Sequence, residues 1–98
     1  MNTKSIAEGP GILVKNLMTA AVTPPPAGYA SRLEYWVRHT GIGEPKCAHE
    51  VCDRAATEGA MARLAFSMDK TVYIFPACET CARRTEMLYI SGPIIPVP

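Results

Sequence analysis

The chain has 98 residues, a formal net charge of +1 and 19% charged residues. This length suits one domain and is too short for two. The near-neutral charge gives no general attraction to nucleic acid or to an anionic membrane, although it leaves room for a local basic patch. No stretch reads as a signal peptide or a membrane span, so we expect a cytoplasmic protein with no membrane partner.

The first 28 residues contain two proline- and glycine-rich interruptions around a short apolar segment. Gly9-Pro10-Gly11 precedes the segment and Pro24-Pro25-Pro26 follows it. Its apolar residues, from Ile12 to Val22, have helical spacing. Because successive prolines do not fit the interior of a helix or strand, we predict an extended N-terminal arm over residues 1–28 and a compact domain over residues 29–98. The apolar segment is expected to pack on its own domain as a short helix or strand, or to dock on a partner.

The next segment, LEYWVRH, can be interpreted as a helix or as a strand. Ser31 followed three residues later by Glu34 has the form of a capping box, and Gly41 is suited to end a helix. The same segment also alternates at strand spacing, so both interpretations stay open. In either case we expect Trp36 to belong to the core, because so short a domain has few other large apolar side chains.

The second half of the chain predicts a β-hairpin, a short helix and an apolar tail. The β-branched and aromatic content favours strands over 60–66 and 71–75, with Pro76 ending the second strand. Good helix formers follow, which favours a helix starting near Cys78. The tail from Tyr89 onward is broken by prolines and can add one edge strand at most.

Four cysteines occur as two close pairs on either side of this hairpin. Cys47 and Cys52 are separated by four residues, and Cys78 and Cys81 form a CxxC pair. Two tight turns joined by a hairpin suit a tetrahedral thiolate site, with each sulfur about 2.3 Å from one zinc ion. The alternatives are disulfides, a redox dithiol or an iron–sulfur cluster. A reducing cytosol favours the metal over disulfides.

His49 lies inside the first cysteine loop and is the one further candidate ligand. Four cysteines complete a tetrahedral shell without it, so we expect His49 to lie at the surface or to hydrogen-bond a neighbour. A closed shell leaves no position for an activated water. The predicted zinc is therefore structural and stabilises the fold.

The order of these features resembles the HNH-like (ββα-metal, treble-clef) zinc family of small bacterial and phage proteins. The resemblance covers roughly residues 33–97 and rests on four stretches of sequence: LEYWVRHTG, CAHEVCDRAATEGA, YIFPACETC and LYISGPIIPVP. It implies a small zinc-stabilised α+β domain built from a knuckle, a β-hairpin and a short helix.

Two departures from the family pattern bear on catalysis. The family's Gly-Ala pair is typically followed by a histidine, the candidate general base, and Met61 stands there in this chain. The family's CxxC is typically followed by asparagine, and here Ala82 follows. Neither side chain can accept a proton from water or hold a hard divalent ion. We therefore expect no enzyme, with a divergent HNH-type nuclease using His39 or His49, or a thiol redox protein, as the alternatives.

These observations predict a non-catalytic binding module that presents a surface to another macromolecule. A protein partner is favoured over DNA or RNA because the total charge is near neutral, and no small-molecule substrate is indicated. Such a scaffold would suit a phage or mobile-element inhibitor of a host protein complex. A basic patch for nucleic acid could form from Arg32, Arg38, Lys46, Arg54, Arg63, Arg83 and Arg84. The carboxylates are expected to be solvated surface groups: Glu50, Asp53, Glu58, Asp69, Glu79 and Glu86.

Overall fold

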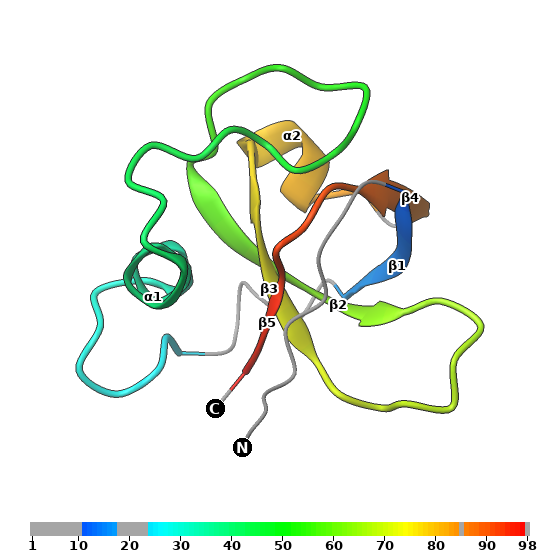
Figure 1. The fold of residues 1–98 in the computed structure, drawn as a ribbon, viewed down its shortest axis with the longest axis horizontal. Coiled ribbons are helices and arrows are strands. Elements are labelled where there is room, and N and C mark those ends of the chain that lie inside the picture. Colours follow the sequence, from blue (N-terminus) through cyan, green and yellow to red (C-terminus); the bar gives the residue numbers. More distant parts are fainter. Residues whose placement is uncertain (1–10, 18–23, 85, 98) are drawn as a thin grey trace.

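The computed structural model describes residues 11–17, 24–84 and 86–97, which form a small α+β domain around one antiparallel sheet (Figure 1). The sheet has five strands in the order β4-β1-β2-β3-β5. The strands are β1 (Ile12–Leu17), β2 (Glu58–Leu64), β3 (Tyr73–Ala77), β4 (Met87–Ile90) and β5 (Ile95–Pro96). The helices are α1 (Arg32–Thr40) and α2 (Glu79–Ala82). The expected α+β class is confirmed.

Strand β1 is an interior strand of this sheet and corrects the division into an arm and a domain. It pairs with β2 on one side and with β4 on the other, so residues 12–17 belong to the same sheet as the chain after residue 29. Val14 and Asn16 are buried while Lys15 is exposed, which is the alternation of a strand and not helical spacing. The rest of the predicted apolar segment, from Met18 to Val22, lies outside the described residues.

Helix α1 settles the ambiguity around LEYWVRH in favour of a helix. The Ser31 hydroxyl accepts a hydrogen bond from the Glu34 amide at 3.0 Å, which is the N-cap expected from the sequence. Gly41 has φ 78° and donates its amide to the Val37 carbonyl, so it ends the helix in the left-handed conformation that glycine tolerates best. The segment between the two caps is therefore helical and not an extended strand.

The predicted hairpin is β2 and β3, paired from Glu58↔Ala77 to Ala62↔Tyr73. The expectation that Pro76 ends the second strand is wrong, since β3 continues to Ala77. Pro76 is tolerated because its carbonyl accepts from Ala48 and β5 reaches only Tyr73 and Ile74. The missing proline N–H therefore removes no strand-to-strand hydrogen bond.

The two faces of the sheet carry different side chains and different covers. One face holds the larger core, which includes Val14, Phe75 and Ile90 together with three of the cysteines. The other face packs Met61, Ile74 and Ile95 against α1 through the buried Trp36, as expected for that residue. Trp36 donates its indole N–H to the Pro93 carbonyl at 3.0 Å.

Helix α1 approaches β2 very closely at Gly59. A Cβ atom at Gly59 would lie 2.6 Å from the Leu33 amide nitrogen, so only glycine allows this contact between helix and strand.

The tail supplies both edges of the sheet, one strand more than expected. Strand β4 pairs with β1 at one edge and β5 pairs with β3 at the other. Ile90, Ile94 and Ile95 are buried, so the apolar tail covers its own domain. Among residues 11–17, 24–84 and 86–97, no helix is long and apolar enough to cross a membrane.

Candidate metal centre

The first cysteine pair lies in a tight loop, residues 47–52, which we call the knuckle. The Cys47 amide donates to the Arg54 carbonyl at 2.8 Å, and the Cys52 amide donates to the His49 carbonyl at 2.9 Å. A bridge between Lys46 and Ala55 closes the base of the loop. The backbone thus turns both thiols of the pair to the same side.

The second pair is placed by the end of β3 and the start of α2. Cys78 is the N-cap of α2, and its Sγ accepts from the Cys81 amide at 3.5 Å. The Ala82 amide donates to the Cys78 carbonyl at 2.9 Å and completes the first turn. The predicted helix near Cys78 is therefore present, but it is only four residues long.

The four thiols converge on one point. The Sγ atoms of Cys47, Cys52, Cys78 and Cys81 all lie within 4.8 Å of one another. The Cys52 and Cys78 sulfurs are 3.8 Å apart, which matches the sulfur–sulfur edge of about 3.8 Å in a tetrahedron with Zn–S bonds of about 2.3 Å. The four-cysteine cluster predicted from the spacing is confirmed, and it could hold one metal ion.

Burial and hydrogen bonding separate the pKa values of these thiols. Burial raises the pKa of Cys47. Burial and the neighbouring thiols raise the pKa of Cys81 to about 12. Burial also acts to raise the pKa of Cys78, but the Cys81 amide and the neighbouring thiols outweigh it and lower that pKa to about 7. Negative charge in the cluster is therefore held first at Cys78, which has the helical N–H directed at its sulfur.

His49 contacts the cluster without being one of the converging side chains. Its Nδ1 lies 3.4 Å from Cys81 Sγ, and the ring is half-buried. The backbone of the knuckle is held against β4 by a bridge between His49 and Ile90 and by a hydrogen bond from the Glu50 amide to the Tyr89 carbonyl at 3.0 Å. The imidazole is thus placed to hydrogen-bond the Cys81 sulfur, as the sequence led us to expect.

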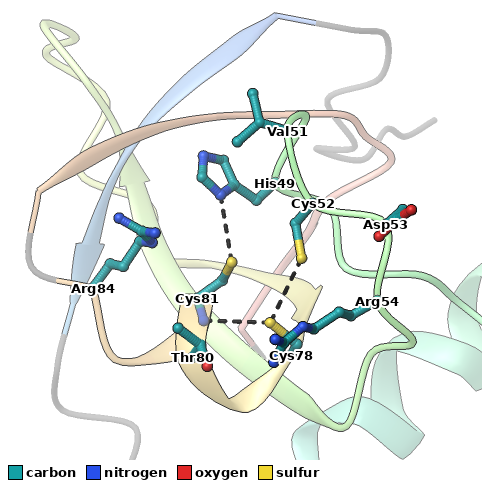
Figure 2. Close-up of a pocket in the computed structure, with 9 residues that line it drawn as sticks. All are labelled: His49, Val51, Cys52, Asp53, Arg54, Cys78, Thr80, Cys81 and Arg84. Atoms are coloured by element: carbon teal, nitrogen blue, oxygen red, sulfur yellow. Dashed lines mark hydrogen bonds between the residues drawn. The ribbon is translucent and has the colours of Figure 1, made fainter.

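An open pocket of about 260 Å³ lies over the cluster (Figure 2). Arg54 and Arg84 lie on opposite sides of it in this view, and His49 extends toward Cys81 between them. Arg84 also pairs with Glu86 at 2.9 Å, which raises the pKa of the guanidinium. The two cations therefore flank the sulfurs and compensate thiolate charge.

Asn16, which sequence reasoning did not single out, ties the cysteine-bearing helix to the sheet. Its side chain is 4% exposed. The Nδ2 group lies 3.4 Å from the Cys81 carbonyl, 3.1 Å from the Ala82 carbonyl and 2.6 Å from the Arg84 carbonyl. Its Oδ1 is buried without a donor among the described residues. The only signal in the sequence is a lone amide at an alternating position of an apolar strand.

The two positions that depart from the nuclease pattern lie apart in the fold. Met61 is buried against Trp36 on the α1 face, whereas Ala82 packs against the core on the cysteine face. His39 is exposed on α1, where its Nδ1 lies 2.9 Å from the Tyr35 carbonyl. The structure therefore does not bring His39 and Met61 together with Ala82 and the cysteine cluster.

The carboxylates and cations of the predicted surface are largely engaged locally. Arg38 pairs with Glu34 at 3.5 Å, and Arg83 pairs with Glu79 at 3.3 Å. Arg32 donates to the Gly59 carbonyl at 3.1 Å. Asp69 accepts from Thr71 and Tyr73, and hydrogen bonds from Thr71 hold its pKa below the usual value. These contacts belong to helix and turn structure, except that of Arg32, which joins α1 to β2.

Comparison of the chain with known protein families, with curated proteins and with solved structures finds no match.

Proposed function

We propose that the chain is a structural-zinc module of the treble-clef, HNH-like kind, with the ion held by Cys47, Cys52, Cys78 and Cys81. The observation that carries this proposal is the convergence of four sulfur atoms within 4.8 Å, three of them on buried residues. Thiolates are ligands that zinc prefers in structural sites. The chain order of knuckle, hairpin β2–β3 and helix α2 supports the treble-clef assignment.

A zinc ion held by four thiolates would act on folding and not on a substrate. All four tetrahedral positions would be filled by protein sulfur, so no position is left for an activated water. The ion would connect the knuckle to α2 and so join the two sides of the larger core. Its binding energy is then part of the folding free energy.

We further propose that the module binds another macromolecule and catalyses no reaction. Met61 and Ala82 supply neither a base nor a ligand for a hard divalent ion. The separation of His39 from the cluster supports the same conclusion for a nuclease that would use this histidine. A thiol redox role requires accessible sulfurs, whereas Cys47, Cys78 and Cys81 are buried.

Elemental analysis with a thiol titration, on protein purified without added metal, tests the zinc assignment. We expect one zinc per chain and four cysteines that stay unreactive toward a disulfide reagent until a chelator and denaturant are added. Iron with visible absorption would point to an iron–sulfur cluster instead. Four reactive thiols without metal, or two disulfides, would contradict the proposal.

His49 is expected to strengthen zinc retention without being required for folding. Replacing His49 by alanine removes the hydrogen bond to the Cys81 sulfur, and loss of such a partner lowers metal affinity by about 10-fold or more. Competition with a chromogenic zinc chelator measures the change. The matched control is His39→Ala on α1, which should behave as wild type. Equal affinities for the two variants would show that the His49 contact does not support the site.

A further inference from the structure

In the described part of the chain, α1 covers β2 and β3 and no helix lies over the β1–β4 part of the same sheet face. In Figure 1, α1 lies on the left beside β2 and β3, whereas β1 and β4 lie on the right, away from α1. The α1 core includes Met61, Ile74 and Ile95 from β2, β3 and β5, and no residue of β1 or β4. We call the remaining part, formed by β1, β4 and the end of β2, the open face.

Register pairing identifies the side chains of the open face. Side chains directly opposite each other in an antiparallel pair share a face, as do residues two apart along a strand. Lys15 is opposite Arg63 on β2 and opposite Met87 on β4, while Leu13 is opposite Tyr89. The open face is therefore made of Leu13, Lys15, Leu17, Arg63, Met87 and Tyr89.

The open face carries two cations and no acid. Lys15 and Arg63 lie directly opposite each other, an arrangement of like charges that destabilises a sheet. Neither has a carboxylate partner among the residues that the structure describes. The one acid in β1, β2 and β4 is Glu58, and its place two residues from Ala60 puts it on the opposite face. An anionic partner would relieve this repulsion.

Two large apolar side chains stand beside the cations. Tyr89 is 56% exposed and Met87 is 45% exposed, although their neighbours Leu88 and Ile90 are buried. Lys15 is opposite Met87, so Tyr89, two residues further along β4, is its diagonal neighbour on the same face. One ligand can therefore touch both side chains. The face thus offers a ring for stacking next to a pair of positive charges.

We propose that the open face binds single-stranded nucleic acid, with Tyr89 stacking on a base and Lys15 and Arg63 contacting phosphates. Single strands present anionic groups and unpaired ring faces together, and proteins bind them with exposed aromatic side chains beside cations. An acidic protein segment would satisfy the charges but would leave the tyrosine ring without a matching partner. The proposal names the partner of the zinc module and rests on that proposed function.

Fluorescence anisotropy with a labelled oligothymidylate, at low and increasing salt, tests the proposal on the full chain. Binding by two phosphate contacts predicts a slope of log K against log salt of about −1.4. Tyr89→Leu should weaken binding about tenfold, whereas Tyr89→Phe keeps the ring and should bind as wild type. Lys15→Gln and Arg63→Gln should each reduce the slope by about 0.7. The matched charge control is Lys70→Gln, in the exposed loop between β2 and β3 and outside the open face, which should leave both quantities unchanged.

Two outcomes would overturn the nucleic-acid assignment. One is no binding of the oligonucleotide at any soluble protein concentration. The other is equal binding of polyglutamate, insensitive to Tyr89→Leu, which would identify an acidic protein partner. Zinc content is measured on every variant. One zinc per chain together with either outcome would reject the open face as a nucleic-acid site while leaving the zinc module intact.

Discussion

Replacing Cys81 by serine is expected to abolish cooperative folding and zinc binding together. Serine stays protonated at neutral pH and does not replace a thiolate as a zinc ligand. Structural zinc contributes about 10–16 kcal/mol of apparent binding free energy, which is as large as the total stability of about 5–15 kcal/mol of a typical domain. Circular dichroism during heating, with zinc content measured on the same sample, checks this result.

The control for Cys81→Ser is a serine placed elsewhere at the site. Val51 lies at the tip of the knuckle and is 86% exposed, so Val51→Ser should change the free energy of unfolding by no more than about 0.5 kcal/mol. A Cys81→Ser protein that melts cooperatively at the wild-type temperature would show that the cluster does not hold the fold together.

Replacing Asn16 by leucine is expected to destabilise the domain by about 3 kcal/mol, because three backbone carbonyls lose their side-chain donor. Removal of the unpartnered Oδ1 offsets part of this cost. Since Cys81 lies in the turn that Asn16 holds, zinc should also pass to a chelator faster than from wild type. Urea unfolding of zinc-saturated protein measures the free energy of unfolding, and a chelator assay measures the rate of zinc loss.

Lys15→Gln is the neighbouring control for Asn16→Leu, since Lys15 is in the same strand but faces solvent. It should change the free energy of unfolding by no more than about 0.5 kcal/mol. If Asn16→Leu behaves like this control in both assays, the amide does not support the metal-bearing helix.

The parts of the fold that depend on residues close together in the chain were predicted from the sequence. Ser31 and Gly41 set the ends of α1 because a cap depends on one side chain or one φ angle. The cysteine cluster followed from spacing because each pair lies in one tight turn. The hairpin was predicted in place, with each of its four strand ends displaced by two residues.

The missed features depend on contacts between distant segments. Pairing of β1 with β4 joins Ile12 to Ile90, and no local pattern encodes that choice. The three prolines after residue 23 led us to predict an arm. Prolines show where a regular element must end, but they do not show which strands the preceding segment pairs with. Asn16 is an interior polar residue whose partners are carbonyls more than sixty residues away. The lone amide in an apolar strand does not indicate which carbonyls it will contact until the fold is known.

The interior position of β1 also affects the order in which the domain can form during synthesis. A nascent chain made only as far as Arg84 contains all four cysteines and the β2 partner of β1, but not β4. The outer edge of β1 then has unpaired N–H and C=O groups and is open to other strands. Pairing with β4 covers that edge, so a chain that ends between Arg84 and Met87 would contain all four cysteines and still be prone to aggregate.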